Sequence, residues 1–229
     1  MVVATVLGVP FRAASAIRRA RVFHPDGAMF TGELVRLAPD DQGLPLHSCA
    51  VVARLSKGLG LPWGALDVVG LAFRLPATAG ADTPWDVLLA SAGIGSLGRM
   101  LPLPTTSWND ANFSSLMPLR FDGRMWWLRA RLLTPHLRGM DLGAPTDALE
   151  APGLMFAIDQ AQGSGAFEPL ATLRSTGALS DAAQSAGDGK FGFDPAVNSP
   201  ASVRPQPEWL RDIRQSAYRN SRAGRRTAE

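Results

Sequence analysis

The sequence is poor in cysteine, lysine and tyrosine, and the shortage of cysteine excludes whole classes of protein. Cys49 is the only cysteine among the 229 residues, so the chain has no intrachain disulfide and no cysteine-rich metal site. A lone cysteine fits a reducing compartment, and we expect a cytoplasmic protein. No uncharged apolar run approaches the roughly 20 residues that span a bilayer, so no transmembrane helix is predicted.

The first residues are apolar, but their flanking charges are in the wrong order for a secretory signal. Arg12, Arg18 and Arg19 follow the uncharged start at residues 1–11 instead of preceding it. The arginine-containing segment at 9–23 leaves a membrane-touching first helix open as an alternative.

Lysine is nearly absent, since Lys57 and Lys190 are the only two among 23 basic residues and the formal net charge is +3. Arginine holds carboxylates and phosphates in a bidentate fork and suits a dianionic ligand. Codon bias explains most of these arginines equally well, so only those within a motif carry an argument. The arginine-rich end at 219–226 has no interleaved aromatic residues, and we expect no nucleic-acid partner.

Short hydrophobic segments separated by Gly, Pro, Asp and Ser clusters predict an α+β, mainly β protein, either a sandwich or a barrel. We expect one domain over residues 1–229. The predicted strands lie at 28–37, 48–56, 65–75, 85–91, 113–121, 124–133, 154–161 and 167–175.

Two of these segments indicate how their faces are used. At 124–133, Trp126, Leu128 and Ala130 alternate with Trp127, Arg129 and Arg131, which predicts one core face and one face toward solvent or ligand. At 65–75 both faces are mostly apolar, as in a strand between a barrel interior and covering segments. We expect helices near 10–20 and from Pro207 onward, with a long irregular connection over 180–205 between the strands and the last helix.

The last predicted helix carries the strongest functional clue. Arg214 and Tyr218 are four residues apart and Arg225 is seven further on, so all three project from one side of a continuous helix. A cation one turn away lowers the pKa of a phenol from about 10, and the resulting phenolate is an Fe(III) ligand. Tyr218 is the only tyrosine in the chain.

Several motifs resemble the catalase and catalase-related peroxidase family, in the same order and with matching spacing. That family has R-x-x-H-x-x-G-x-x-x-x-G, then R-x-S, then D-x-x-G-x-A-x-[KR], and finally R-x-x-x-Y with an arginine seven residues later. The segment at 113–121 also resembles a strand common in its small members. The matching residues are Arg21, His24, Gly27, Gly32, Arg54, Ser56, Asp67, Gly70, Ala72, Arg74, Arg214, Tyr218 and Arg225.

The resemblance implies a compact antiparallel β-barrel with a flanking N-terminal helix and a C-terminal helix that contacts haem b. Tyr218 would be the proximal iron ligand, with Arg214 hydrogen-bonded to its oxygen. His24, held by Ser56, would be the acid–base residue acting on a peroxide or hydroperoxide. The haem propionates would be bound by Arg21, Arg54 and Arg225. Members of the family commonly self-associate, which makes a homo-oligomer an open expectation.

The chain also departs from that pattern. It is too short for the additional segments of true catalases, and Ser91 stands about where a distal asparagine is expected. Both departures favour peroxidase chemistry over efficient disproportionation. Two alternatives stay open, a hydroperoxide-rearranging enzyme of the allene-oxide-forming kind and a non-catalytic haem- or lipid-binding barrel. The simplest alternatives for single residues are a structural role for His24 and helix packing for Tyr218.

Overall fold

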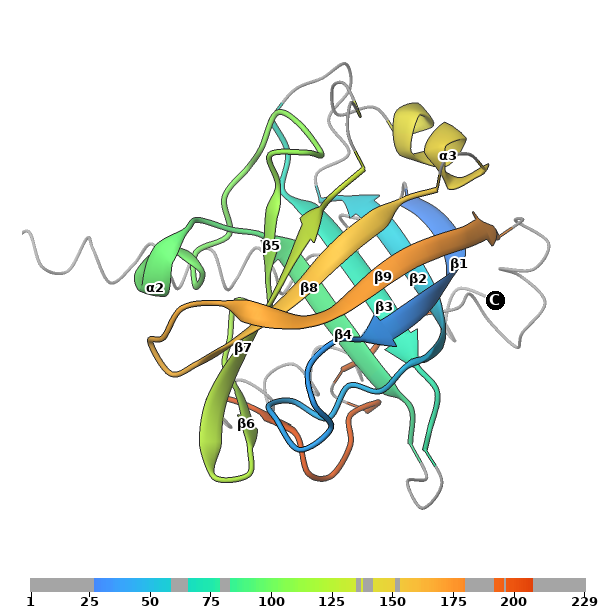
Figure 1. Ribbon diagram of the computed structural model, residues 1–229. Coiled ribbons are helices and arrows are strands. Elements are labelled where there is room, and N and C mark those ends of the chain that lie inside the picture. Colours follow the sequence, from blue (N-terminus) through green and yellow to red (C-terminus); the bar gives the residue numbers. More distant parts are fainter. Residues whose placement is uncertain are drawn as a thin grey trace, which may run out of the picture.

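The strands assemble into a closed antiparallel barrel. A computed structural model describes residues 27–58, 66–78, 83–134, 137, 142–150, 153–179, 192–195 and 197–207. Eight strands form the barrel, in the order β7-β5-β4-β3-β2-β1-β9-β8, and pairing of β8 with β7 closes it (Figure 1). This confirms the predicted mainly β architecture and the barrel. Both predicted flanking helices lie outside the described residues.

The strands are β1 (Gly27–Arg36), β2 (Cys49–Lys57), β3 (Val69–Leu75), β4 (Trp85–Ser91), β5 (Asn112–Ser114), β6 (Leu119–Phe121), β7 (Arg124–Leu132), β8 (Met155–Gln162), β9 (Glu168–Ala178) and β10 (Arg204–Pro205). The helices of the described residues are α2 (Gly95–Gly98) and α3 (Gly143–Glu150). Both are far shorter than a helix that traverses a bilayer.

The segment predicted as one strand at 113–121 is two strands. It contributes β5 to the barrel and β6 to a hairpin that extends the sheet beyond β7. Leu116 has a φ of 57°, in the left-handed region, and Pro118 has no backbone N–H to donate to a ladder. The hairpin from β6 to β7 turns at Asp122 and Gly123, with φ angles of 48° and 70°, the signature of a two-residue type I′ turn.

The barrel interior is filled by side chains. Alternate residues of each strand point inward, and an eight-stranded barrel is just wide enough for such side chains to fill it. Phe113 and Phe156 meet edge to face across the core, with ring centroids 6.3 Å apart. In β7 the predicted core face is confirmed at Leu128, Ala130 and Leu132, which are all buried. Trp127, predicted on the face toward solvent or ligand, is also buried, because Arg99 lies over its ring.

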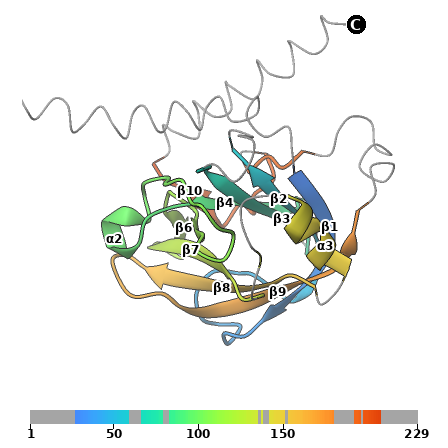
Figure 2. The same cartoon turned by 90° about the horizontal axis from the view of Figure 1, so that it is seen from above.

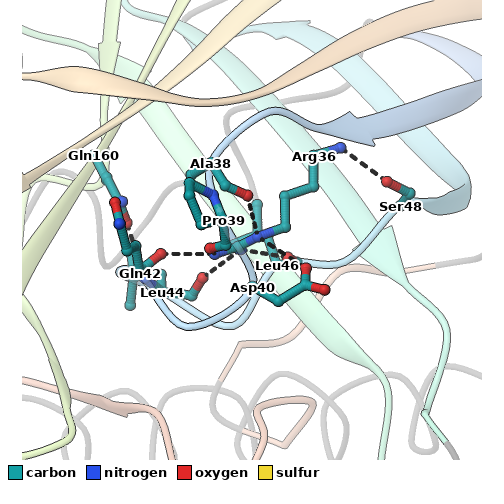
Figure 3. Close-up of polar contacts among 9 residues, drawn as sticks. All are labelled: Arg36, Ala38, Pro39, Asp40, Gln42, Leu44, Leu46, Ser48 and Gln160. Carbon is teal, nitrogen blue, oxygen red and sulfur yellow. Dashed lines mark hydrogen bonds and ion pairs between the residues drawn. The ribbon is translucent and has the colours of Figure 1, made fainter.

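One end of the barrel is closed by the loop at 37–48, which is organised around Arg36 (Figure 3). The guanidinium donates hydrogen bonds of 2.6–3.0 Å to five backbone carbonyls of this loop. Leu44 and Leu46, which the loop carries, are at most 1% exposed and cap the core. The backbone N–H of Leu44 also donates to Gln160 Oε1 of β8 at 2.8 Å, which ties the loop to the barrel wall.

Candidate functional site

The motif residues of β2 and β3 lie together on the outside of the barrel. We name the outward-facing side of β1–β4 the outer wall (Figure 2). In the antiparallel register, Ser56 pairs with both Gly27 and Gly70, and Gly70 pairs with Ala90. These four residues form one row across four strands, and none has a side chain larger than a hydroxymethyl group. Their neighbours along each strand, including Leu55, point into the core.

The next row of the outer wall contains Arg54, paired with Met29 and Ala72. A Cβ on Gly27 would lie 2.5 Å from Arg54 Nε and 2.8 Å from the Leu55 carbonyl oxygen. The Arg54 side chain therefore lies against the Gly27 backbone, and glycine is the residue that leaves room for this approach. Arg54 also has an interaction within the protein, so its guanidinium is not an isolated charge.

Gly32, the other glycine of the N-terminal motif, lies where β1 packs closely against β9. A Cβ there would lie 2.8 Å from the carbonyl oxygen of Arg174 in β9. The register between β1 and β9 shifts at Thr31 and Gly32, where the strands form a β-bulge or similar irregularity. Both glycines therefore allow the carbonyl of a neighbouring strand to approach the β1 backbone closely.

The third row of the outer wall holds a buried ion pair that the sequence did not reveal. Arg74 Nε and one terminal nitrogen donate to the two carboxylate oxygens of Asp86 at 2.5 and 2.7 Å. The Asp86 side chain is fully buried, and its Oδ2 also accepts from the Asp194 backbone N–H and Asn198 Nδ2. Asp86 therefore fastens the segment at 192–198 to the barrel. The only sequence signal was that Asp86 interrupts an otherwise apolar strand.

Ser91 lies on the other face of the wall from Ser56. Its strand neighbour Ala90 takes the outward position beside Gly70, so Ser91 points inward and is 2% exposed. The Ser91 hydroxyl accepts from the Val69 backbone N–H at 3.1 Å and donates to the Leu103 carbonyl at 2.7 Å. The structure therefore does not bring the two serines together, and the Ser91 hydroxyl links β3 to the loop after β4.

The remaining predicted site residues lie outside the described residues. They are Arg21, His24, Arg214, Tyr218 and Arg225. Within the described ranges, no group of three or more His, Cys, Asp or Glu side chains is arranged to hold a metal ion. A haem iron takes its equatorial ligands from the porphyrin and needs one axial protein ligand, so this observation does not bear on a haem.

The outer wall thus combines a flat strip of small side chains that includes the buried Ser56 hydroxyl, Arg54 in the next row, and the Arg74–Asp86 ion pair beyond it. The strip is flat because Gly27, Gly70 and Ala90 carry no side chain larger than a methyl group, and the Arg54 side chain lies over it at Gly27. A scan against protein-family models finds no family that matches the chain, and a search of the curated proteins finds no match either.

Proposed function

We propose that the protein binds haem b against the outer wall and uses it to react with hydrogen peroxide or an organic hydroperoxide. The observation that carries the proposal is the row of Gly27, Ser56, Gly70 and Ala90, which joins separate motif residues into one flat surface. The motif residues are distant in sequence, yet the strand register gathers them on the same side of the barrel. A porphyrin is a large, planar, mostly apolar ligand that such a surface suits.

The position of Arg54 and the sequence distance between Gly27 and His24 are also compatible with haem. Arg54 lies in the row next to the flat strip, where its guanidinium is suited to a propionate. Ser56 is paired with Gly27, and His24 is three residues before Gly27 in the sequence. The proposal requires the His24 imidazole near Ser56, a position that three residues of chain, at most about 11 Å long, allow.

Each residue has a defined task in this proposal. A haem iron, when bound, supplies the redox chemistry with peroxide. His24 would be the acid–base residue, taking a proton from the peroxide and returning it to the leaving oxygen. Ser56 orients the imidazole. Tyr218 provides the phenolate ligand, and Arg214 keeps that oxygen anionic. Arg21 and Arg225 join Arg54 at the propionates.

The register of β4 bears on the type of reaction. The outward residues of β1–β4 within the described part include no asparagine or glutamine, and Ala90 fills the outward position beside Gly70. An amide at the distal side would position a second peroxide for disproportionation. Its absence from the outer wall supports oxidation of an external donor or an organic hydroperoxide over catalase turnover.

The first test is the absorption spectrum of protein produced with an adequate haem supply. We expect a Soret band that Tyr218→Phe abolishes or shifts. Ala72→Trp should also weaken haem binding at least tenfold, because it fills the outer wall. Ala157→Trp, on the outward side of β8, is the matched control and should leave binding unchanged. Absence of the band in the wild type would refute the proposal.

The second test uses the register directly. Ala90→Asn places an amide on the outer wall beside Gly70, and we expect it to raise oxygen release from hydrogen peroxide. Ser91→Asn places the amide toward the core and should lower stability without that gain. Equal gains from both variants would contradict the placement of the ligand.

A non-catalytic haem-binding barrel is the second candidate, favoured by the lack of an amide among the outward residues of β1–β4 in the described part. Dye oxidation by hydrogen peroxide distinguishes the two. Turnover no faster than free haemin, unchanged by His24→Ala, would support the binding protein. The packed interior does not favour a lipid bound inside the barrel, since its largest side chains are fully buried.

A further inference from the structure

The loop after β4 exposes an unusual concentration of aliphatic side chains. We name residues 94–103 the apolar loop. In both views α2 projects from the side of the barrel (Figures 1 and 2). The exposed side chains are Ile94 at 84%, Leu97 at 77%, Leu103 at 48%, Met100 at 47% and Leu101 at 39%. Single exposed aliphatic residues are ordinary, but a contiguous group on a projecting loop marks a contact surface.

The apolar loop is held in place by its own backbone. The Gly93 N–H donates to the Leu101 carbonyl at 3.2 Å, and the Leu103 N–H donates to the Ser91 carbonyl at 2.9 Å. A Cβ on Gly98 would lie 2.9 Å from the carbonyl carbon of Gly93, so two backbones pack directly. The aliphatic side chains are therefore presented by a pre-formed loop in which several polar backbone groups are already paired.

The apolar loop carries no exposed charge. Between Asp86 and Asp110 the only charged residue is Arg99. Its side chain is 2% exposed, and its guanidinium carbon lies 5.0 Å from the Trp127 ring and 5.3 Å from the Phe167 ring. Burial lowers the pKa of the Arg99 guanidinium. The Arg99 cation is thus buried beneath the loop, and the exposed tip carries no charge.

Positive charge collects at the base of the apolar loop. Arg129 lies over the same Phe167 ring at 4.3 Å. Arg129 and Arg131 both bind the one buried carboxylate of Asp159, at 2.7 and 3.2 Å. Arg99 contacts the same Phe167 ring as Arg129, so three guanidinium groups lie in this cluster, and two of them share the one carboxylate of Asp159.

Arg131 is the accessible member of this cluster. Its side chain is 49% exposed. In the register it pairs with Asn112, whose amide donates to the Gly93 carbonyl at 3.1 Å, at the start of the loop. An exposed cation therefore lies next to the base from which the aliphatic tip projects.

We propose that the apolar loop anchors the protein to an anionic lipid surface, with Ile94 and Leu97 entering the bilayer interface and Arg131 meeting headgroup phosphates. An uncharged tip with exposed Ile94 and Leu97 and a basic residue at its base fits an anionic lipid surface. A protein partner fits less well, because protein interfaces draw most of their binding energy from Trp, Tyr and Arg anchors. This inference does not depend on haem binding.

Vesicle flotation with the full chain tests the anchor. We expect binding to phosphatidylcholine vesicles containing about 30% phosphatidylserine, and weak binding to phosphatidylcholine alone. Ile94→Asp with Leu97→Asp should lower the partition coefficient at least about tenfold. The matched control is Leu37→Asp with Val197→Asp, at side chains 57% and 54% exposed, which should change it less than about twofold. Arg131→Gln should lower binding to the anionic vesicles about fivefold and leave the neutral vesicles unaffected.

A second measurement reports directly on the tip. Because Cys49 is the only cysteine, a Cys49→Ser protein with Leu97→Cys can carry one environment-sensitive dye. Its emission should shift to the blue on anionic vesicles, and dye on Leu37→Cys should not shift. Three results would overturn the anchor: no vesicle binding by the wild type, binding that survives the tip substitutions, or tip substitutions that change only the oligomeric state. The last would identify the loop as a contact between copies.

Discussion

Replacing Arg36 should remove the hydrogen bonds that hold the loop at 37–48 and lower the stability of the whole barrel. The guanidinium donates to the carbonyls of five loop residues, and its side chain is only 6% exposed. Three of these bonds, to Ala38, Leu44 and Leu46, are partly buried, and the other two are exposed. Water replaces the donors at the exposed carbonyls, so the magnitude comes from the buried three.

For Arg36→Ala we expect a loss of about 3–5 kcal/mol in the free energy of unfolding, since each buried acceptor left unpaired costs about 1–3 kcal/mol and some water enters. For Arg36→Lys we expect a loss of about 2 kcal/mol in the free energy of unfolding. A single ammonium nitrogen cannot donate to as many of the loop carbonyls as the three nitrogens of a planar guanidinium. Arg124→Ala, at an exposed arginine of β7, is the control and should lie within about 0.5 kcal/mol of wild type.

Urea unfolding followed by tryptophan fluorescence measures the free energy, and the labelling rate of Cys49 reports on the loop itself. The Arg36 N–H donates to Ser48 Oγ at 2.9 Å, directly beside Cys49. We expect the thiol of Arg36→Ala to label faster than that of wild type under folding conditions. A loss below about 1 kcal/mol with unchanged labelling would refute the reasoning, because the loop would then be held by Leu44 and Leu46 alone.

Three further outcomes follow from the described contacts. Asp86→Asn should cost about 3 kcal/mol in urea unfolding, because it breaks a buried ion pair, whereas Asp40→Asn, at a fully exposed carboxylate, should cost almost nothing. Gly43→Ala should cost about 2 kcal/mol, since its φ is +80° and a Cβ would overlap the Gln160 side chain. Combined with Gln160→Ala it should cost less than the sum of the two changes, as a double-mutant cycle would measure. Burial raises the pKa of the Cys49 thiol above 9.0, so the unfolded chain loses this proton first. The free energy of unfolding should therefore fall above pH 9.0 more steeply in wild type than in Cys49→Ala.

The barrel was predictable because its strands carry clear local patterns. In β7 the inward alternation follows from the positions of Leu128, Ala130 and Leu132, and in β3 the half-buried outer residues match its two apolar faces. The pairing of β1 with β9, which helps to close the barrel, could not be predicted from the sequence. Nothing local in Gly27–Arg36 specifies a partner at 168–178, since such pairing depends on how the whole sheet curls.

The candidate site was predictable only in part, for a related reason. The motif spacing brought Arg54 and Ser56 to one face, because residues two apart on a strand share a side. For β4 the same rule gave no answer, because Trp85–Ser91 has one polar residue on each face, Asp86 on one and Ser91 on the other, so its own sequence does not show which face is inward. Only pairing with β3 shows that Ala90 faces outward and Ser91 inward. The short helix α3 was missed because its eight residues carry little periodic signal.

The β1–β9 pairing has a consequence for synthesis on the ribosome. β1 pairs with β2 and β9, and β9 is translated after every other strand of the barrel. One edge of β1 therefore stays unpaired until translation of the barrel strands is nearly complete. Until then β1 has an unpaired edge, and so does the growing end of the sheet, and unpaired edges invite aggregation. A nascent chain stalled before residue 168 would therefore require chaperone protection, whereas one stalled well beyond residue 178 should already resist protease.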